Sequence, residues 1–101
     1  MPVATRHATV RHAEGLHARP AELVARLATQ YESTITLTHG SLRVDAKSIL
    51  DVLTLGAERG VELAIEADGA DAEQAVQELC KLLESDFALS TAEENNDVES
   101  G

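Results

Sequence analysis

The chain has 101 residues, which suits one domain of ordinary size. Its 18 acidic side chains outnumber 8 basic ones, and the net charge of −10 argues against nucleic acid or an anionic membrane as the partner, because both attract basic surfaces. The single cysteine, Cys80, excludes an internal disulfide, predicts a reducing compartment and is expected to pack within the last helix. No apolar run has the length of a membrane span. The sequence therefore predicts a cytoplasmic protein that does not insert into membranes.

A strand and a helix are predicted first. Residues 3–10 alternate loosely between apolar and polar side chains, and Gly15 ends this pattern. Pro20 suits the first turn of a helix, where its missing N–H costs nothing. The apolar positions that follow have the spacing of an amphipathic helix, and they are Leu23, Val24, Leu27, Ala28 and Tyr31.

An antiparallel hairpin is predicted next, because two alternating segments flank a glycine turn. These segments are residues 33–40 and 42–45, and the turn lies at Gly40. The side chains expected to face inward are Ile35, Leu37, Leu42 and Val44.

The second half of the chain predicts a helix, a strand and a last helix. Residues 47–56 form a short helix that stops at Gly56, and residues 61–68 form a strand. Asp71 is placed to cap the last helix. The inward side chains of these two final elements are Val61, Leu63 and Ile65, then Ala72, Ala75, Val76, Leu79, Leu82 and Leu83.

This order of elements predicts an α+β fold, in which helices cover one face of an antiparallel sheet. The alternation within the strands indicates that the other face is solvated. Composition changes near the C-terminus, where residues 90–101 contain one large apolar side chain, Val98, and four acidic ones. We therefore expect a folded domain over residues 1–89 and a flexible acidic tail over residues 90–101.

His17 stands directly before the first predicted helix, where Ser, Asp or Asn would be better caps. We expect the N–H groups of Ala18, Arg19 and Ala21 to lack partners within that helix, so that with the helix dipole they favour an anion attached to the imidazole. Arg19 adds a planar group that suits phosphate oxygens. One interpretation is therefore a phosphorylated histidine. The other is a surface histidine that fills a loop.

Residues 15–21, GLHARPA, resemble the active-site signature of the HPr family, the histidine-containing phosphocarrier proteins of the sugar phosphotransferase system. Residues 46–50, AKSIL, are similar to the regulatory serine site of that family, and residues 55–75 are similar to its final strand and helix. The resemblance covers about residues 3–88, so it is far more specific than one short motif. It implies an open-faced β-sandwich in which three helices lie on one face of a four-stranded antiparallel sheet, in the order βαββαβα.

The resemblance also implies a function. His17 would accept a phosphoryl group on Nδ1 from enzyme I, which takes it from phosphoenolpyruvate, and would donate it to the IIA domains of sugar permeases. Arg19 would help to hold the phosphate. The chain would then be a stoichiometric carrier rather than an enzyme, with no cofactor and no metal. We also expect a monomer, because no long apolar patch is evident in the sequence.

Ser48 matches the serine that HPr kinase/phosphorylase modifies in species that have this enzyme. Ser48 and Asp51 also have the spacing of a capping box, and capping alone is an equally good interpretation. The two roles are compatible, and a phosphate there would add negative charge that weakens docking. Asp51 departs from the family, where we expect a neutral or basic residue.

In this family partner proteins dock on the first two helices. Mapped onto this chain, that face contains Arg19, Arg26, Lys47, Ser48, Ile49 and Leu53. The basic side chains would suit acidic partners. Taken alone, Ile49 and Leu53 are more typical of a core than of an exposed anchor. The acidic tail is either inert or competes with partners for this face.

The sequence also allows two other interpretations. A regulatory member of the family would bind transcription regulators or enzymes instead of supporting sugar uptake. A metal-binding module would use His7, His12, His17 and His39, but their spacing matches no metal signature.

Overall fold

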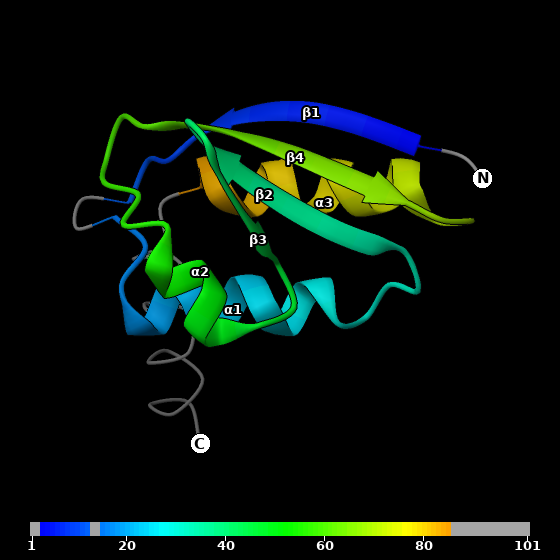
Figure 1. Ribbon diagram of the computed structural model, residues 1–101, viewed down its shortest axis with the longest axis horizontal. Coiled ribbons are helices and arrows are strands. Elements are labelled where there is room, and N and C mark those ends of the chain that lie inside the picture. The colour runs from blue at the N-terminus through cyan, green and yellow to red at the C-terminus, as the bar shows by residue number, and fades with distance from the viewer. Residues whose placement is uncertain (1–2, 13–14, 86–101) are drawn as a thin grey trace, which may run out of the picture.

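The computed structural model describes residues 3–12 and 15–85. The predicted order of elements is confirmed (Figure 1). The elements are β1 (Val3–Thr9), α1 (Ala18–Ala28), β2 (Thr34–His39), β3 (Leu42–Asp45), α2 (Ile49–Thr54), β4 (Glu62–Asp68) and α3 (Ala72–Glu84). The predicted tail, residues 90–101, lies outside the described residues.

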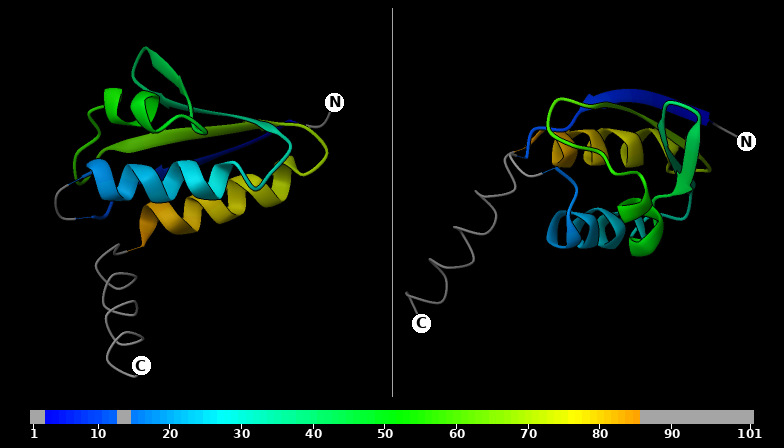
Figure 2. Two further views of the ribbon diagram at one scale, coloured as in Figure 1. Left: turned by 90° about the horizontal axis from the view of Figure 1, so that it is seen from below. Right: turned by 60° about the vertical axis from the view of Figure 1, so that its left-hand side comes forward.

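The four strands form one antiparallel sheet in the order β1-β4-β2-β3. The last strand in sequence therefore lies between the first two, and β1 and β3 are the edges. The three helices gather on one side of this sheet (Figures 1 and 2). The predicted α+β, open-faced architecture is confirmed.

The core lies between the sheet and the helices. The predicted inward side chains of the central strands are fully buried, namely Ile35, Leu37, Leu63 and Ile65. α3 contributes the predicted stripe, with Leu79 and Leu83 fully buried and Leu82 partly so. Val24 is the fully buried large side chain of α1. The alternation in the strands and the helical spacing in α3 thus identify most of the side chains that form this core.

α1 begins as predicted, directly after His17 and with Pro20 in its first turn, but it differs from its prediction at the other end. It ends at Ala28, so Tyr31 lies beyond the helix. The end coincides with Thr29, whose hydroxyl donates to the carbonyls of residues 25 and 26 and so satisfies the last turn.

The predicted stripe of α1 is confirmed in part. Val24 and Ala28 are buried, and the half-buried Leu27 packs against the core. The structure also buries Ala21 and Ala25, which the prediction did not include, whereas Leu23 is only half-buried.

Leu42 was predicted to face inward but is exposed. It lies in the same phase as the buried Val44, but it is the first residue of an edge strand, directly after the turn at Gly40. Phase alone therefore does not bury a side chain at the end of an edge strand, where no helix covers it.

Asp71 precedes α3 as predicted, but its carboxylate makes no cap to that helix. It accepts instead from the N–H of Glu32 and from the N–H and hydroxyl of Ser33. These bonds, with the Ser33 hydroxyl first, lower the pKa of the Asp71 carboxyl. Asp71 thus fastens the α1–β2 loop to the start of α3.

Candidate functional site

A tight contact between two loops positions the residues before α1. The N–H of Leu16 donates to the carbonyl of Ala57 at 2.9 Å, and both side chains are buried. Gly15 has a φ of +77°, and a Cβ there would lie 2.6 Å from the Ala57 oxygen and 2.8 Å from the Glu58 Cα. Only glycine therefore permits this approach. The contact of Gly15 and Leu16 with Ala57 therefore fixes the position of the backbone that leads into His17.

His17 is the N-cap residue of α1, and its side chain is exposed. Its backbone is extended, and its ring makes no capping bond to the helix. The carbonyl of His17 accepts from the N–H of Ala21 at 2.8 Å. The imidazole is therefore presented to solvent at a helix start while the backbone beneath it is held.

The expectation that Ala21 has an N–H without a partner in the helix was wrong. Ala21 is the fourth helical residue, and its N–H closes the first intrahelical bond. Pro20 has no N–H to offer. Ala18 and Arg19 are the first two helical positions, so the helix has no carbonyl four residues earlier to accept from their N–H groups. Both are exposed beside His17.

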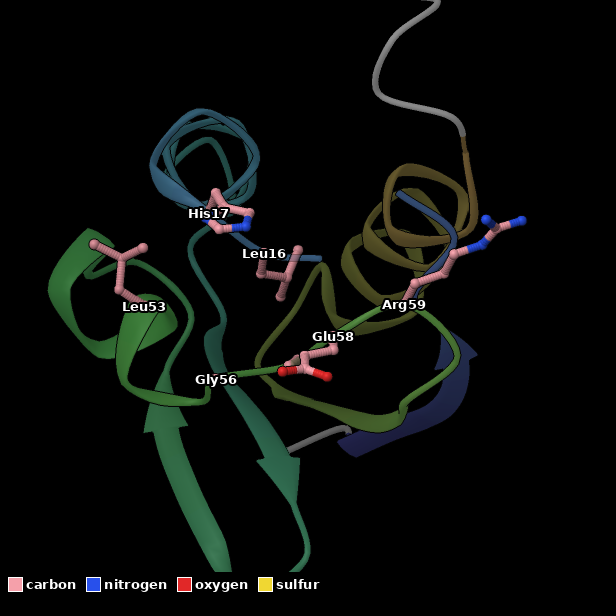
Figure 3. Close-up of a pocket in the computed structure, with 7 residues that line it drawn as sticks. Leu16, His17, Leu53, Gly56, Glu58 and Arg59 are labelled. Atoms are coloured by element: carbon pink, nitrogen blue, oxygen red, sulfur yellow. The ribbon is translucent and has the colours of Figure 1, made fainter. Parts of the chain in front are cut away.

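A cavity of about 450 Å³ opens beside His17. It is lined by Leu16, His17, Leu53, Gly56, Ala57, Glu58 and Arg59 (Figure 3). Sequence reasoning did not single out Glu58 or Arg59. The sequence feature that could have indicated them is their position between Gly56 and Gly60, because two closely spaced glycines predict a loop. In Figure 3 the Arg59 guanidinium points away from His17.

Ser48 is the N-cap of α2, and its hydroxyl accepts from the N–H of Asp51 at 3.2 Å. The capping interpretation is therefore confirmed for this half of the box. The reciprocal half is absent among the described contacts, because the Asp51 carboxylate accepts from the N–H of Asp45 instead. Ser48 is half-exposed, so its hydroxyl combines a structural role with access to solvent.

Three apolar side chains of α2 are exposed, Ile49 at 42%, Leu50 at 76% and Leu53 at 36%. The preference for a core role of Ile49 and Leu53 was wrong, and Leu50 was missed. A helix of six residues with apolar side chains all round buries only one side, here at Val52. The sequence already showed that apolar residues lie on every side of this helix.

Arg26 and Lys47 lie beside Ile49, the first of these apolar side chains. They line, with Ile49, a second cavity of about 330 Å³ between the two helices. Arg26 pairs with Glu22 at 3.2 Å, an exposed contact worth little. The Lys47 ammonium donates to the carbonyl of Tyr31 at 2.8 Å. We call the surface of Arg26, Lys47, Ile49, Leu50 and Leu53 the α1–α2 face.

The histidines considered as metal ligands lie on different elements. His7 is in β1, His17 caps α1, and His39 ends β2 with Nδ1 3.3 Å from the carbonyl of Leu55. Within residues 3–12 and 15–85 no group of three or more His, Cys, Asp or Glu side chains is placed to hold a metal. No helix in the same ranges has the length and apolarity needed to cross a membrane.

Comparison with known proteins identifies the family. The family model PTS-HPr, described as the phosphorylation site of the HPr component of the phosphotransferase system, matches residues 4–85. Phosphocarrier protein HPr of Mycoplasma capricolum subsp. capricolum is 43% identical over 63 residues, which cover 62% of this chain and 71% of that protein.

Solved structures give the same answer. The crystal structure of an HPr from Bacillus anthracis has a TM-score of 0.79 at 29% identity, over 82% of this chain and 99% of that one. Crh, the Bacillus subtilis catabolite repression protein described as a domain-swapped dimer, has a TM-score of 0.65 at 34% identity, over 73% of this chain and 85% of that one. The chain belongs to the HPr family, the phosphocarrier proteins of the phosphotransferase system.

Proposed function

We propose that His17 carries a phosphoryl group from enzyme I to the IIA domains of sugar permeases. The observation that carries this proposal is the exposed imidazole of His17 at the N-cap of α1, within the GLHARPA segment. A ring that made a capping bond would be occupied, whereas this ring leaves its nitrogens available to a donor.

The transfer is a nucleophilic substitution at phosphorus. The lone pair of Nδ1 forms the new N–P bond, with the ring proton on Nε2, and the bond from phosphorus to the donor breaks with its electron pair staying on the donor. The product is a phosphoramidate on His17, and the reverse sequence delivers the group to an acceptor. The N–H groups of Ala18 and Arg19, the helix dipole and the Arg19 guanidinium favour the phosphate charge. The protein is then a stoichiometric carrier rather than an enzyme.

Partners are proposed to dock on the α1–α2 face, which borders His17 and combines exposed apolar side chains with two cations. Ser48 is proposed as the regulatory site of an HPr kinase/phosphorylase. A phosphate on its hydroxyl would replace a capping acceptor by a more charged one and place about two negative charges beside the docking face.

The test is phosphorylation with phosphoenolpyruvate and purified enzyme I, measured by intact mass and ³¹P NMR. One acid-labile phosphate is expected on the chain and on Ser48→Ala, and none on His17→Ala. Retention of the adduct by a folded His17→Ala variant would reject the assignment.

A second candidate is a regulatory protein that acts by binding transcription regulators or enzymes. The likeness to Crh, a protein described in terms of catabolite repression, supports it. Capture of a transcription regulator after Ser48 phosphorylation, with no transfer from His17 to any IIA domain, would favour this candidate.

A further inference from the structure

We propose that residues 86–101 bind to the α1–α2 face of their own domain and compete there with partner proteins. The first observation is that this face exposes three large apolar side chains. Leu50 is 76% exposed, Ile49 lines a cavity together with Arg26 and Lys47, and Leu53 lines the cavity beside His17. Exposed apolar side chains of this kind, bordered by charge, mark a binding surface.

The composition of residues 86–101 fits this surface. The segment contains five acidic side chains and no basic one, and it holds Phe87, the only phenylalanine of the chain, together with Leu89. The apolar side chains of the segment can pack against Ile49, Leu50 and Leu53. Its acidic side chains can pair with Arg26 and Lys47.

The charge distribution selects one face of the domain. Over α1, Lys47 and α2 there are three basic side chains, Arg19, Arg26 and Lys47, against two acidic ones, Glu22 and Asp51. The open face of the sheet has the opposite balance, because its outward phase carries Asp45, Glu62, Glu66 and Asp68 against Arg43 alone. An acidic segment is repelled from the open face and attracted to the surface of α1 and α2.

The fold brings the end of α3, the last described element, to the part of the domain where α1 begins. The N–H of Arg11 donates to the carbonyl of Leu83, which holds the end of α3 beside the strand that leads to His17. Both views in Figure 2 place the end of α3 at the same end of the molecule as the start of α1. Sixteen residues can span about 50 Å when extended, whereas α1 is about 16 Å long.

Tethering makes weak contacts sufficient. Two sites joined by a short linker meet at an effective concentration on the order of millimolar. A segment whose intrinsic Kd is also about millimolar therefore occupies the face about half the time, which weakens a competing partner about twofold. The occupancy should fall with salt, because the attracting charges are exposed.

The binding itself is tested by NMR on the full chain, without any partner. Cys80→Ser combined with Ser100→Cys allows a nitroxide to be attached near the C-terminus. We expect the amide signals of Ile49, Leu50 and Leu53 to be broadened more strongly than those of Thr36 and Glu66 on the open face. Broadening that is equal on both faces, or stronger on the open face, would overturn the proposal.

A matched variant tests the cause. Phe87→Ala and Leu89→Ala with Asp86→Asn, Glu93→Gln, Glu94→Gln, Asp97→Asn and Glu99→Gln keep the chain length and remove the two large apolar side chains and all five acidic charges named above, so the selective broadening should disappear. Its persistence would contradict the proposal.

Competition is tested by the rate of phosphorylation by enzyme I, and this part rests on the proposed function. The same tail variant should react about twofold faster at low salt and equally at high salt. Equal rates at low salt would refute competition. Failure of both proteins to be phosphorylated would instead refute the carrier function, and the NMR result would be unaffected.

Discussion

At the scale of single residues, Gly15 determines where His17, the proposed phosphoryl acceptor, lies, because its missing Cβ allows two loops to touch. Gly15→Ala would place a Cβ 2.6 Å from the Ala57 oxygen at a φ of +77°. We expect the loop that carries His17 to shift. A displacement of about 1 Å can slow a positioned reaction about 10²-fold. The measurement is the rate of phosphorylation by enzyme I.

The control is Gly40→Ala, which meets a similar backbone angle, φ +65°, in open space. Gly40→Ala should lower the stability of the fold because alanine is strained at a positive φ, but it should leave the rate of phosphorylation by enzyme I unchanged. A folded Gly15→Ala variant that reacts at the normal rate would show that the contact with Ala57 is not what positions His17.

Asp71 gives a prediction about pH. Its hydrogen bonds to Ser33 and Glu32 lower its pKa, so the folded state binds this proton less readily than the unfolded state. The stabilisation is therefore present above the ordinary value of about 4 and is lost as pH falls through the lowered value. Asp71→Asn should lower the Tm at pH 7.

The difference in Tm between wild type and Asp71→Asn should shrink toward pH 2. Asp68→Asn, at an exposed position on β4, is the control and should change the Tm little at either pH. An unchanged Tm of Asp71→Asn at pH 7 would show that this carboxylate does not hold the loop.

At the scale of elements, α2 is short enough for one cap to matter. It has six residues, and the Ser48 hydroxyl satisfies the N–H of Asp51. Loss of such a cap costs about 1 kcal/mol. Ser48→Ala should therefore lower the free energy of unfolding by about this amount in urea denaturation, and Ser48→Asn should restore it.

Ser48→Asp separates capping from charge. Asp is also a good cap, so stability should be kept, while its negative charge beside the α1–α2 face should weaken enzyme I binding measured by calorimetry. Equal binding by Ser48→Asp and Ser48→Asn would argue against electrostatic regulation at this position.

At the scale of the whole molecule, α1 and α2 together form a surface that neither helix forms alone. Leu50 is 76% exposed, so Leu50→Ser should leave the Tm nearly unchanged and yet weaken enzyme I binding. Val3→Ser is the control, because Val3 is 57% exposed on the β1 edge, away from α1 and α2. Equal effects of the two substitutions on binding would remove Leu50 from the docking surface.

Local patterns in the sequence were sufficient to predict the seven elements, their order, the inward side chains of the central strands and the resemblance of GLHARPA to the HPr family. These features depend on neighbours within a turn or a strand, where spacing alone sets which face a side chain occupies. The glycine stop at Gly56 also belongs here, since its φ of +59° ends a helix locally.

Other features depended on contacts between distant segments. β4 lies between β1 and β2, Asp71 binds the loop before β2 instead of capping its own helix, and Gly15 packs against Ala57. Leu42 and Leu50 are exposed because none of the seven described elements covers them. Long-range packing decided these points, since the same local pattern is compatible with several partners until the chain closes on itself.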